Sequence, residues 1–400
     1  MKIWILTSSF PSNPQDARAA AGLFVADFAV ALAEAGHEVS VITPDKSPGE
    51  KLDPPGVRVH WFPWRGGRKP LSSLRPYLPG DLIAMVSLFR RGARALDDLY
   101  QRAAPDHVLA MWAAPSGILA TRLGRRRGVS VTTWCLGSDV WTLGRYPILR
   151  GVVRRVLRSS DLVFADGVQL AKDAEALGGR PCAFMPSSRR LNRALARPLD
   201  LPETGARFLF IGRYAPVKGV DVLLEAMAEF ARREPNGHLN LFGGGPLDAQ
   251  IRRRADRPDL RGRVTIGAYA DEAVAVSYLA ASDCVVIPSR MESIPVIFSD
   301  ALQMNRPLIV TDVGDMGTLL REHPAGLVVP PEDSSALCAA MLQMATQDRS
   351  RYTPGIQRLA AQFDVTKVAA AWIRRVQSPS NPGISPRPRG VGGSSSASSS

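Results

Sequence analysis

The amino-acid sequence predicts an α/β fold in which two domains each contain a parallel sheet. Three observations lead to this prediction. Short apolar runs alternate with segments of helical spacing, a pattern typical of parallel sheets covered by helices. The alternation restarts after a polar segment near the middle of the chain. The length of 400 residues suits two domains of ordinary size.

The first half alternates strand and helix from its beginning. Phe24, Phe28 and Leu32 share one face of a predicted helix at 23–35, which Gly36 ends. Pro44 ends the strand that follows. The predicted strands of this half are 2–6, 38–42, 57–62, 107–111, 130–134 and 162–165.

The second half repeats the pattern after a polar, proline-containing segment at 186–205. Its predicted strands are 207–211, 238–242, 264–266, 284–287, 308–311 and 327–329. We place the two domains at 1–190 and 206–362, with the linker at 191–205. We expect a helix at 363–377 that returns to the first domain. The tail 378–400 is rich in Pro, Gly and Ser and is expected to be disordered.

The composition indicates anionic partners. Lys and Arg number 50 against 37 Asp and Glu, which gives a net charge of +13. Such a charge attracts phosphorylated substrates, anionic membranes or nucleic acid. We expect no nucleic-acid partner, because no binding module with interleaved aromatic residues is present. No apolar run has the length of a membrane span or a signal segment. The expected location is therefore cytoplasmic, with peripheral association at the inner face of the cell membrane as an option.

Two cations lie at a predicted strand-to-helix junction. Gly212 and Arg213 follow an apolar strand, and Lys218 precedes a segment of helical spacing. Such junctions bind ligands in open α/β sheets, and helix entries favour anions. An Arg–Lys pair there predicts a diphosphate site. Two solvated surface cations are the alternative.

Two further motifs follow predicted strands of the second half. The glycines 243–245 let the backbone approach a ligand closely, although an ordinary tight turn has the same composition. Glu292 precedes a helix that we expect to start near Pro295 and to reach Met304, and Asp300 lies inside that helix. Two carboxylates so placed can bind hydroxyls at two ends of one ligand. A capping acid and a solvated helix acid are the alternative.

The first half contains two weaker features. Gly22 lies at the entry of its first helix, where a plain helix start is the alternative. The segment 145–158 interleaves Arg150, Arg154, Arg155 and Arg158 with apolar residues, which predicts a basic amphipathic helix. Such a helix binds an anionic membrane surface, or it simply packs arginine stems over apolar neighbours.

In this order and spacing, the pieces resemble the retaining glycosyltransferases of family four. That family has the GT-B architecture, in which two doubly wound, Rossmann-like domains face each other across a cleft. The resemblance extends from Met1 to about Val376. The segments that carry it are Gly36-His37-Glu38-Val39, Leu136-Gly137-Ser138-Asp139, the blocks at 212–219 and 244–246, the Glu-x7-acid pattern at 292–300, and 307–314.

The resemblance implies roles for individual residues. Arg213, Lys218 and Glu292 would be catalytic: the two cations would stabilise the departing diphosphate, and Glu292 would contact the donor sugar. Asp300 would bind the ribose of the nucleotide, and Asp139 is the candidate on the acceptor side. No Asp-x-Asp pair is present, so we expect no metal and no other cofactor. The implied donor-binding residues are Gly22, Gly212, Gly243, Gly244, Ala268, Tyr269, Ser293, Ile294, Pro295, Val296 and Asp300.

The implied function is transfer of a hexose from a UDP- or GDP-linked sugar to a saccharide or lipid-linked glycan, with retention of configuration. The setting would be the synthesis of cell-surface polysaccharide or glycolipid. Two positions depart from the family pattern: Asp300 replaces the usual Glu, and Leu136 stands where many relatives have His. Either that histidine is dispensable, Asp139 partly replaces it, or the enzyme is poor. A non-catalytic nucleotide-sugar-binding or scaffolding relative and a sugar-nucleotide epimerase therefore stay open as alternatives.

Overall fold

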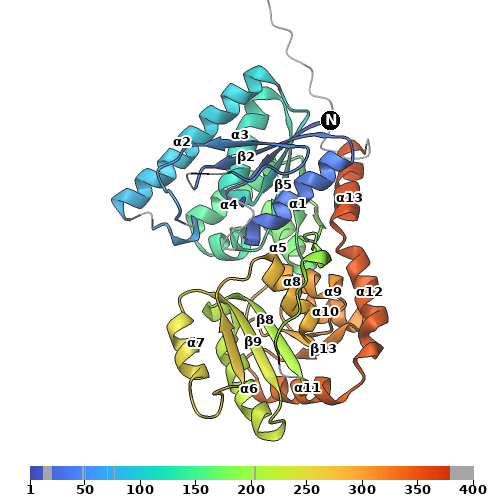
Figure 1. Ribbon diagram of the computed structural model, residues 1–400. Coiled ribbons are helices and arrows are strands. Elements are labelled where there is room, and N and C mark those ends of the chain that lie inside the picture. The colour runs from blue at the N-terminus through green and yellow to red at the C-terminus, as the bar shows by residue number, and fades with distance from the viewer. Residues whose placement is uncertain are drawn as a thin grey trace, which may run out of the picture.

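A computed structural model describes residues 1–11, 20–46, 49, 51–69, 71–75, 77–201 and 204–378. The predicted tail lies outside the described residues, apart from Ser378. The described chain forms two lobes, each built around a parallel sheet with helices on its faces (Figure 1). The α/β prediction of two doubly wound parallel-sheet domains is confirmed.

The first lobe contains a seven-stranded sheet in the order β3-β2-β1-β4-β5-β6-β7. All of its strand pairs are parallel. The strands are β1 (Lys2–Leu6), β2 (Glu38–Pro44), β3 (Val57–Phe62), β4 (His107–Met111), β5 (Ser130–Cys135), β6 (Leu162–Ala165) and β7 (Cys182–Phe184). Its helices are α1 (Ala20–Glu34), α2 (Pro79–Arg102), α3 (Ile118–Arg127), α4 (Pro147–Ser159) and α5 (Val168–Gly178).

The second lobe contains a six-stranded parallel sheet in the order β10-β9-β8-β11-β12-β13. The strands are β8 (Arg207–Arg213), β9 (His238–Gly244), β10 (Val264–Gly267), β11 (Cys284–Ile287), β12 (Leu308–Thr311) and β13 (Gly326–Val329). The helices are α6 (Val220–Arg233), α7 (Asp248–Ala255), α8 (Glu272–Ala281), α9 (Val296–Gln303), α10 (Met316–Glu322), α11 (Ser334–Thr346) and α12 (Thr353–Gln362).

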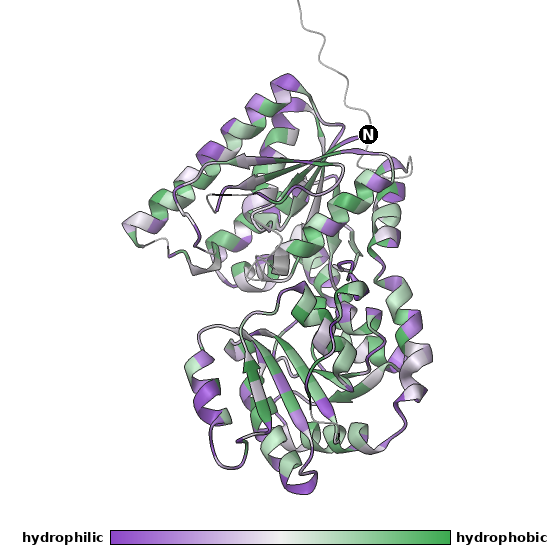
Figure 2. Cartoon of the chain, in the orientation of Figure 1, coloured by the Kyte–Doolittle hydropathy of each residue, from purple (hydrophilic) through white to green (hydrophobic). Residues whose placement is uncertain are grey.

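Burial explains why these runs become strands. The two central strands of the first sheet are mostly apolar and buried: Ile3 and Ile5 of β1, and Val108 and Leu109 of β4, are fully buried. Strands covered by helices on both faces are expected to be continuously apolar. Figure 2 shows the strands largely in green, whereas α7 at the edge of the second lobe is mostly purple. Each lobe therefore has its own core.

The last helix, α13 (Val365–Gln377), leaves the second lobe and lies beside α1 (Figure 1). Its Trp372 is fully buried and packs edge-on against Phe28 of α1 and His107 of β4. Burying an aromatic ring of this size contributes several kcal/mol, about 3–5 by truncation. The helix therefore ties the end of the chain to the first lobe. None of the described helices is long and apolar enough to cross a bilayer.

Candidate functional site

In both sheets the strand order reverses between two central strands. The reversal lies between β1 and β4 in the first lobe and between β8 and β11 in the second. Chains that leave neighbouring strands in opposite directions open a crevice at the carboxyl edge, where open α/β sheets bind ligands. The second-lobe reversal is bordered by the segment 212–219 after β8 and the segment 288–296 after β11. The predicted catalytic residues are all in these two segments.

Arg213, Lys218 and Glu292 form the charged part of this reversal. Lys218 closes a short 3-10 turn at Pro216–Lys218, and its Nζ is ion-paired with Glu292 Oε2. The side chains of this pair are 21% and 19% exposed, so solvent and ligands can reach both. Arg213 is exposed, and no ion pair joins it to any residue that the structure describes. The site thus has one unpaired cation and one cation held by a carboxylate.

The two segments are packed directly on each other. A Cβ at Gly219, where φ is +63°, would lie 2.0 Å from the carbonyl oxygen of Pro288, so only glycine fits. Arg290 reinforces the contact. It donates to Asp221 of α6 at 2.8 Å through each terminal nitrogen, pairs with Glu332, and its backbone N–H donates to Val217 at 2.8 Å. Sequence reasoning missed Arg290, because its partners are distant in sequence.

The predicted glycine loop meets the same edge. Gly212 and Gly243 are register partners in adjacent strands, as are Arg213 and Gly244. The Tyr269 hydroxyl donates to the Gly244 carbonyl at 2.8 Å, and its ring covers the open side of that glycine. Tyr269 is 39% exposed. An aromatic face beside the glycines is therefore available to a flat ligand group; its neighbour Ala268 is also exposed.

The helix entry at 293–296 faces the first lobe. Pro295 is the N-cap of α9, so it precedes the helix and does not lie in its first turn. No side chain caps this end, which leaves the first N–H groups of the helix available to an anion or hydroxyl. Ser293 and Ile294 are buried, and Val296 packs on the core of the first lobe.

Contacts between the segments 145–169 and 291–315 join the carboxyl edges of the two sheets; we call this region the lobe boundary. The backbone N–H of Gln169 donates to the Asp315 carboxylate at 3.0 Å. Arg145 contacts the sulfur of Met291 at 3.8 Å. The loop of the second lobe that contains Met291 and Glu292 is therefore in contact with the first lobe on one side.

Asp300 lies next to this region but has a partner of its own. Arg189 donates to both of its carboxylate oxygens, with three bonds of 2.7 to 3.0 Å. The two side chains are 10% and 3% exposed. Burial raises the pKa of Asp300, and the adjacent guanidinium opposes this effect. A ribose would have to share this carboxylate with Arg189, a partner that sequence reasoning did not foresee.

Both carboxylate oxygens of Asp139 are buried and accept hydrogen bonds from backbone N–H groups. It is 1% exposed and accepts N–H bonds from Ala113 at 2.8 Å and from Leu136 and Val140 at 3.2 Å. It therefore holds the loop after β4 against the loop after β5. Gly22 lies in the first turn of α1, where a Cβ would meet the backbone of Phe10 at 2.9 Å.

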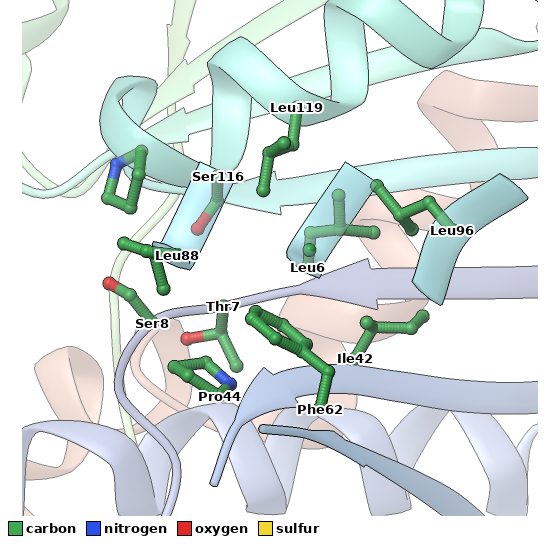
Figure 3. Close-up of a pocket in the computed structure, with 12 residues that line it drawn as sticks. Leu6, Thr7, Ser8, Ile42, Pro44, Phe62, Leu88, Leu96, Ser116 and Leu119 are labelled. Atoms are coloured by element: carbon green, nitrogen blue, oxygen red, sulfur yellow. The ribbon is translucent and has the colours of Figure 1, made fainter. Parts of the chain in front are cut away.

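The first lobe has two surface features near its carboxyl edge. A largely apolar pocket opens between α2, α3 and the ends of β1 and β2; Figure 3 shows the hydroxyls of Thr7, Ser8 and Ser116 among its walls. It contains none of the predicted donor-site residues. The basic segment forms α4, which buries Val153 and Val156 and exposes its arginines. Ile148, at its start, is 83% exposed.

Both lobes match known protein families. Residues 20–186 match the model of the glycosyl transferase 4-like domain, and residues 205–347 match that of glycosyl transferases group 1. A glycosyltransferase provisionally assigned to teichuronic acid biosynthesis in Bacillus subtilis is 26% identical over 94% of this chain and 98% of its own. The phosphatidyl-myo-inositol mannosyltransferase of Mycolicibacterium smegmatis is 27% identical over 90% of both chains.

Solved structures agree on the fold. A sucrose-phosphate synthase from Thermosynechococcus elongatus superposes with a TM-score of 0.75 at 20% identity, over 94% of this chain and 98% of its own. HepE from Anabaena, solved with UDP-glucose, gives 0.69 at 16% identity over 94% and 99%. With both family models matched in order and the two parallel sheets in place, this chain belongs to the group 1 glycosyltransferases of GT-B architecture.

Proposed function

We propose that this chain transfers a hexose from a UDP- or GDP-linked sugar to a saccharide or lipid-linked glycan, with retention of configuration and without a metal or other cofactor. The observation that carries the proposal is the placement of unpaired Arg213 beside the Lys218–Glu292 pair at the strand-order reversal of the second sheet.

In this proposal the donor diphosphate binds Arg213 and Lys218. Lys218 exchanges Glu292 for a phosphate oxygen, and the freed carboxylate accepts a hydroxyl of the donor sugar. The bond between C1 and the phosphate oxygen breaks while the acceptor hydroxyl oxygen bonds to C1 on the same face. The hydroxyl proton passes to the departing phosphate, whose charge both cations stabilise. No side chain is assigned as a nucleophile.

The remaining predicted donor residues surround this position. Gly212, Gly243 and Gly244 give the phosphates close access to the backbone, and Tyr269 offers its ring to the base. Ser293, Ile294 and Val296 offer backbone N–H groups at the α9 entry, whereas Pro295 has none. Asp300 would meet the ribose while Arg189 holds it. Gly22 would approach the phosphates from the first lobe.

The acceptor and its setting are proposed from the relatives and from the surface of α4. The names of the teichuronic acid and phosphatidylinositol relatives support synthesis of cell-surface polysaccharide or glycolipid. The exposed arginines and Ile148 of α4 support peripheral binding at the inner face of the cell membrane.

The test is nucleotide release and sugar transfer by the purified protein with UDP-glucose, UDP-galactose and GDP-mannose. Arg213→Ala, Lys218→Ala and Glu292→Ala are each expected to lower kcat/KM by about 10²-fold or more. Arg253→Ala, an exposed arginine on α7, is the matched control and should retain full activity. Activity in EDTA tests whether the reaction proceeds without a metal. NMR of the product tests whether the anomeric configuration is retained.

Other outcomes point to other functions. Donor binding without any turnover would indicate the non-catalytic relative. Conversion of one free sugar nucleotide into another would indicate an epimerase. Full activity in the Arg213 and Glu292 variants would rule out this site.

A further inference from the structure

Asp166 has a buried carboxyl oxygen without a partner. The residue directly follows β6 and is 6% exposed, and no described residue hydrogen-bonds its Oδ1. Buried side-chain oxygens almost always have a partner, so an exception calls for an explanation. In an enzyme, such a group is commonly one that a ligand completes.

Asp166 lies at the lobe boundary. A Cβ built on the next residue, Gly167, would lie 2.2 Å from Ser293 Oγ and 2.6 Å from Asp315 Oδ2. The turn after β6 is therefore pressed against the loop that carries Glu292. The Ser293 hydroxyl is also buried without a hydrogen-bond partner. Two unsatisfied polar groups, one from each lobe, thus lie close together.

The surrounding charges restrict what can bind. Burial raises the pKa of Asp166 well above its ordinary value, and the charges of Asp139, Glu292 and Asp315 raise it further. The Ser293 hydroxyl is near enough to lower this pKa, although the pair does not meet hydrogen-bond geometry. A phosphate is unsuitable beside so many acids. A neutral hydroxyl suits both forms of the carboxyl, because the ionised form accepts and the protonated form also donates.

Asp139, the first-lobe acid predicted from the sequence as a site residue, has hydrogen-bond partners that Asp166 Oδ1 lacks. The Asp139 carboxylate is already engaged by backbone N–H groups. Asp166 therefore provides a buried first-lobe carboxyl oxygen that has no hydrogen-bond partner and lies near Glu292.

We propose that Asp166 is a specificity-determining residue that binds a hydroxyl of the donor sugar, in a subsite shared with Ser293 and Glu292. This rests on the proposed function and adds a first-lobe contact to it. The nucleotide half of the donor would not touch Asp166. Sugar recognition then requires Asp166 of the first lobe, whereas nucleotide recognition does not involve this residue.

Calorimetry measures two sets of affinities: those for the nucleotides UDP and GDP, and those for the nucleotide sugars UDP-glucose, UDP-galactose and GDP-mannose. The variants are Asp166→Asn and Asp166→Leu. Asp161→Asn is the control, because it makes the same charge change near the amino end of β6. Asp166→Leu is expected to weaken nucleotide-sugar binding about tenfold and to leave nucleotide binding within about twofold. Asp166→Asn should alter the preference between UDP-glucose and UDP-galactose.

A stability measurement separates this role from a structural one. Because Oδ1 has no partner in the free protein, Asp166→Asn should unfold at a urea concentration no lower than wild type does. A structural role predicts earlier unfolding and equal losses of both affinities, which would overturn the proposal. Unchanged nucleotide-sugar affinity would overturn it too, while leaving the proposed function intact. If the wild-type protein binds none of the five probes, the proposed function fails and this inference fails with it.

Discussion

At the scale of single residues, the backbone at Gly243 has no room for a side chain. A Cβ there would lie 1.9 Å from the Gly212 carbonyl oxygen and 3.1 Å from the Tyr214 ring. Gly243→Ala should therefore force β8 and β9 apart and cost about 1–3 kcal/mol of unfolding free energy in urea. Gly151→Ala on α4 is the control: its Cβ meets nothing within 4 Å, and it should gain up to about 1 kcal/mol. Equal stabilities of the two variants would contradict this account.

His107 makes the first lobe sensitive to acid. Burial lowers its pKa from 6.5 to about 3, and it lies between Thr132 and the Trp372 ring. Below pH 6.5 the unfolded chain binds a proton that the folded chain excludes until about pH 3. As the pH is lowered from 6.5 toward 3, the free energy of unfolding should therefore fall by up to about 1.4 kcal/mol per pH unit.

His107→Gln removes this titration, so its unfolding free energy should depend less on pH between 6 and 4 than that of wild type. Urea unfolding at several pH values gives both slopes. Parallel curves for wild type and His107→Gln would exclude His107 as the source.

At the scale of elements, the segment between the lobes is held by a buried ion pair. Arg189 and Asp300 join it to α9, and removing one partner leaves the other charge buried. Asp300→Ala should therefore cost about 3–5 kcal/mol of unfolding free energy. The double variant Arg189→Met/Asp300→Leu should lose less than Asp300→Ala alone, since no charge stays unpaired.

The neighbouring pair Arg190–Glu34 is the control for that prediction. It has equally short bonds, of 2.9 and 2.8 Å, but its side chains are 47% and 50% exposed. Solvent screens such a pair, so Glu34→Ala should have a far smaller effect. If Glu34→Ala and Asp300→Ala destabilise the protein equally, burial is not what makes the Arg189 pair matter.

Strands and local motifs could be predicted from the sequence, because their causes are local. The run Cys284-Val285-Val286-Ile287 is apolar on both faces and became β11 with the predicted bounds. β7 was missed because Cys182–Phe184 is short and lies at the sheet edge. The glycines and cations of the segment 212–219 indicated a ligand site after β8, where the strand order of the second sheet reverses.

Side-chain partners far apart in sequence could not be predicted in this way. Arg189 and Asp300 are separated by 111 positions, and no local pattern links them. The same holds for Asp139, whose burial depends on loops after two different strands. Asp166 belongs to no sequence motif, and the missing partner of its Oδ1 can be seen only in the structure.

At the scale of the whole molecule, the net charge of +13 is unevenly placed. The acids Asp139, Glu292 and Asp315 are all close enough to Asp166 to affect its pKa, whereas α4 exposes arginines beside Ile148. In the proposed function the donor sugar therefore lies near these acids, and Arg213 and Lys218 meet its phosphates. The basic surface of α4 is left for another anionic partner, and an anionic bilayer suits its mixture of arginine and exposed apolar side chains.

Vesicle co-sedimentation tests this division of charge. The protein should bind phosphatidylglycerol vesicles at low salt, bind phosphatidylcholine vesicles weakly, and dissociate as salt rises. Arg154→Glu/Arg155→Glu should weaken binding by about tenfold or more. Arg253→Glu/Arg257→Glu makes the same change in net charge on the second lobe and should have little effect. If the two variants lose binding equally, total charge rather than α4 governs the interaction. If Ile148→Ser also binds as wild type does, the apolar start of α4 does not enter the bilayer.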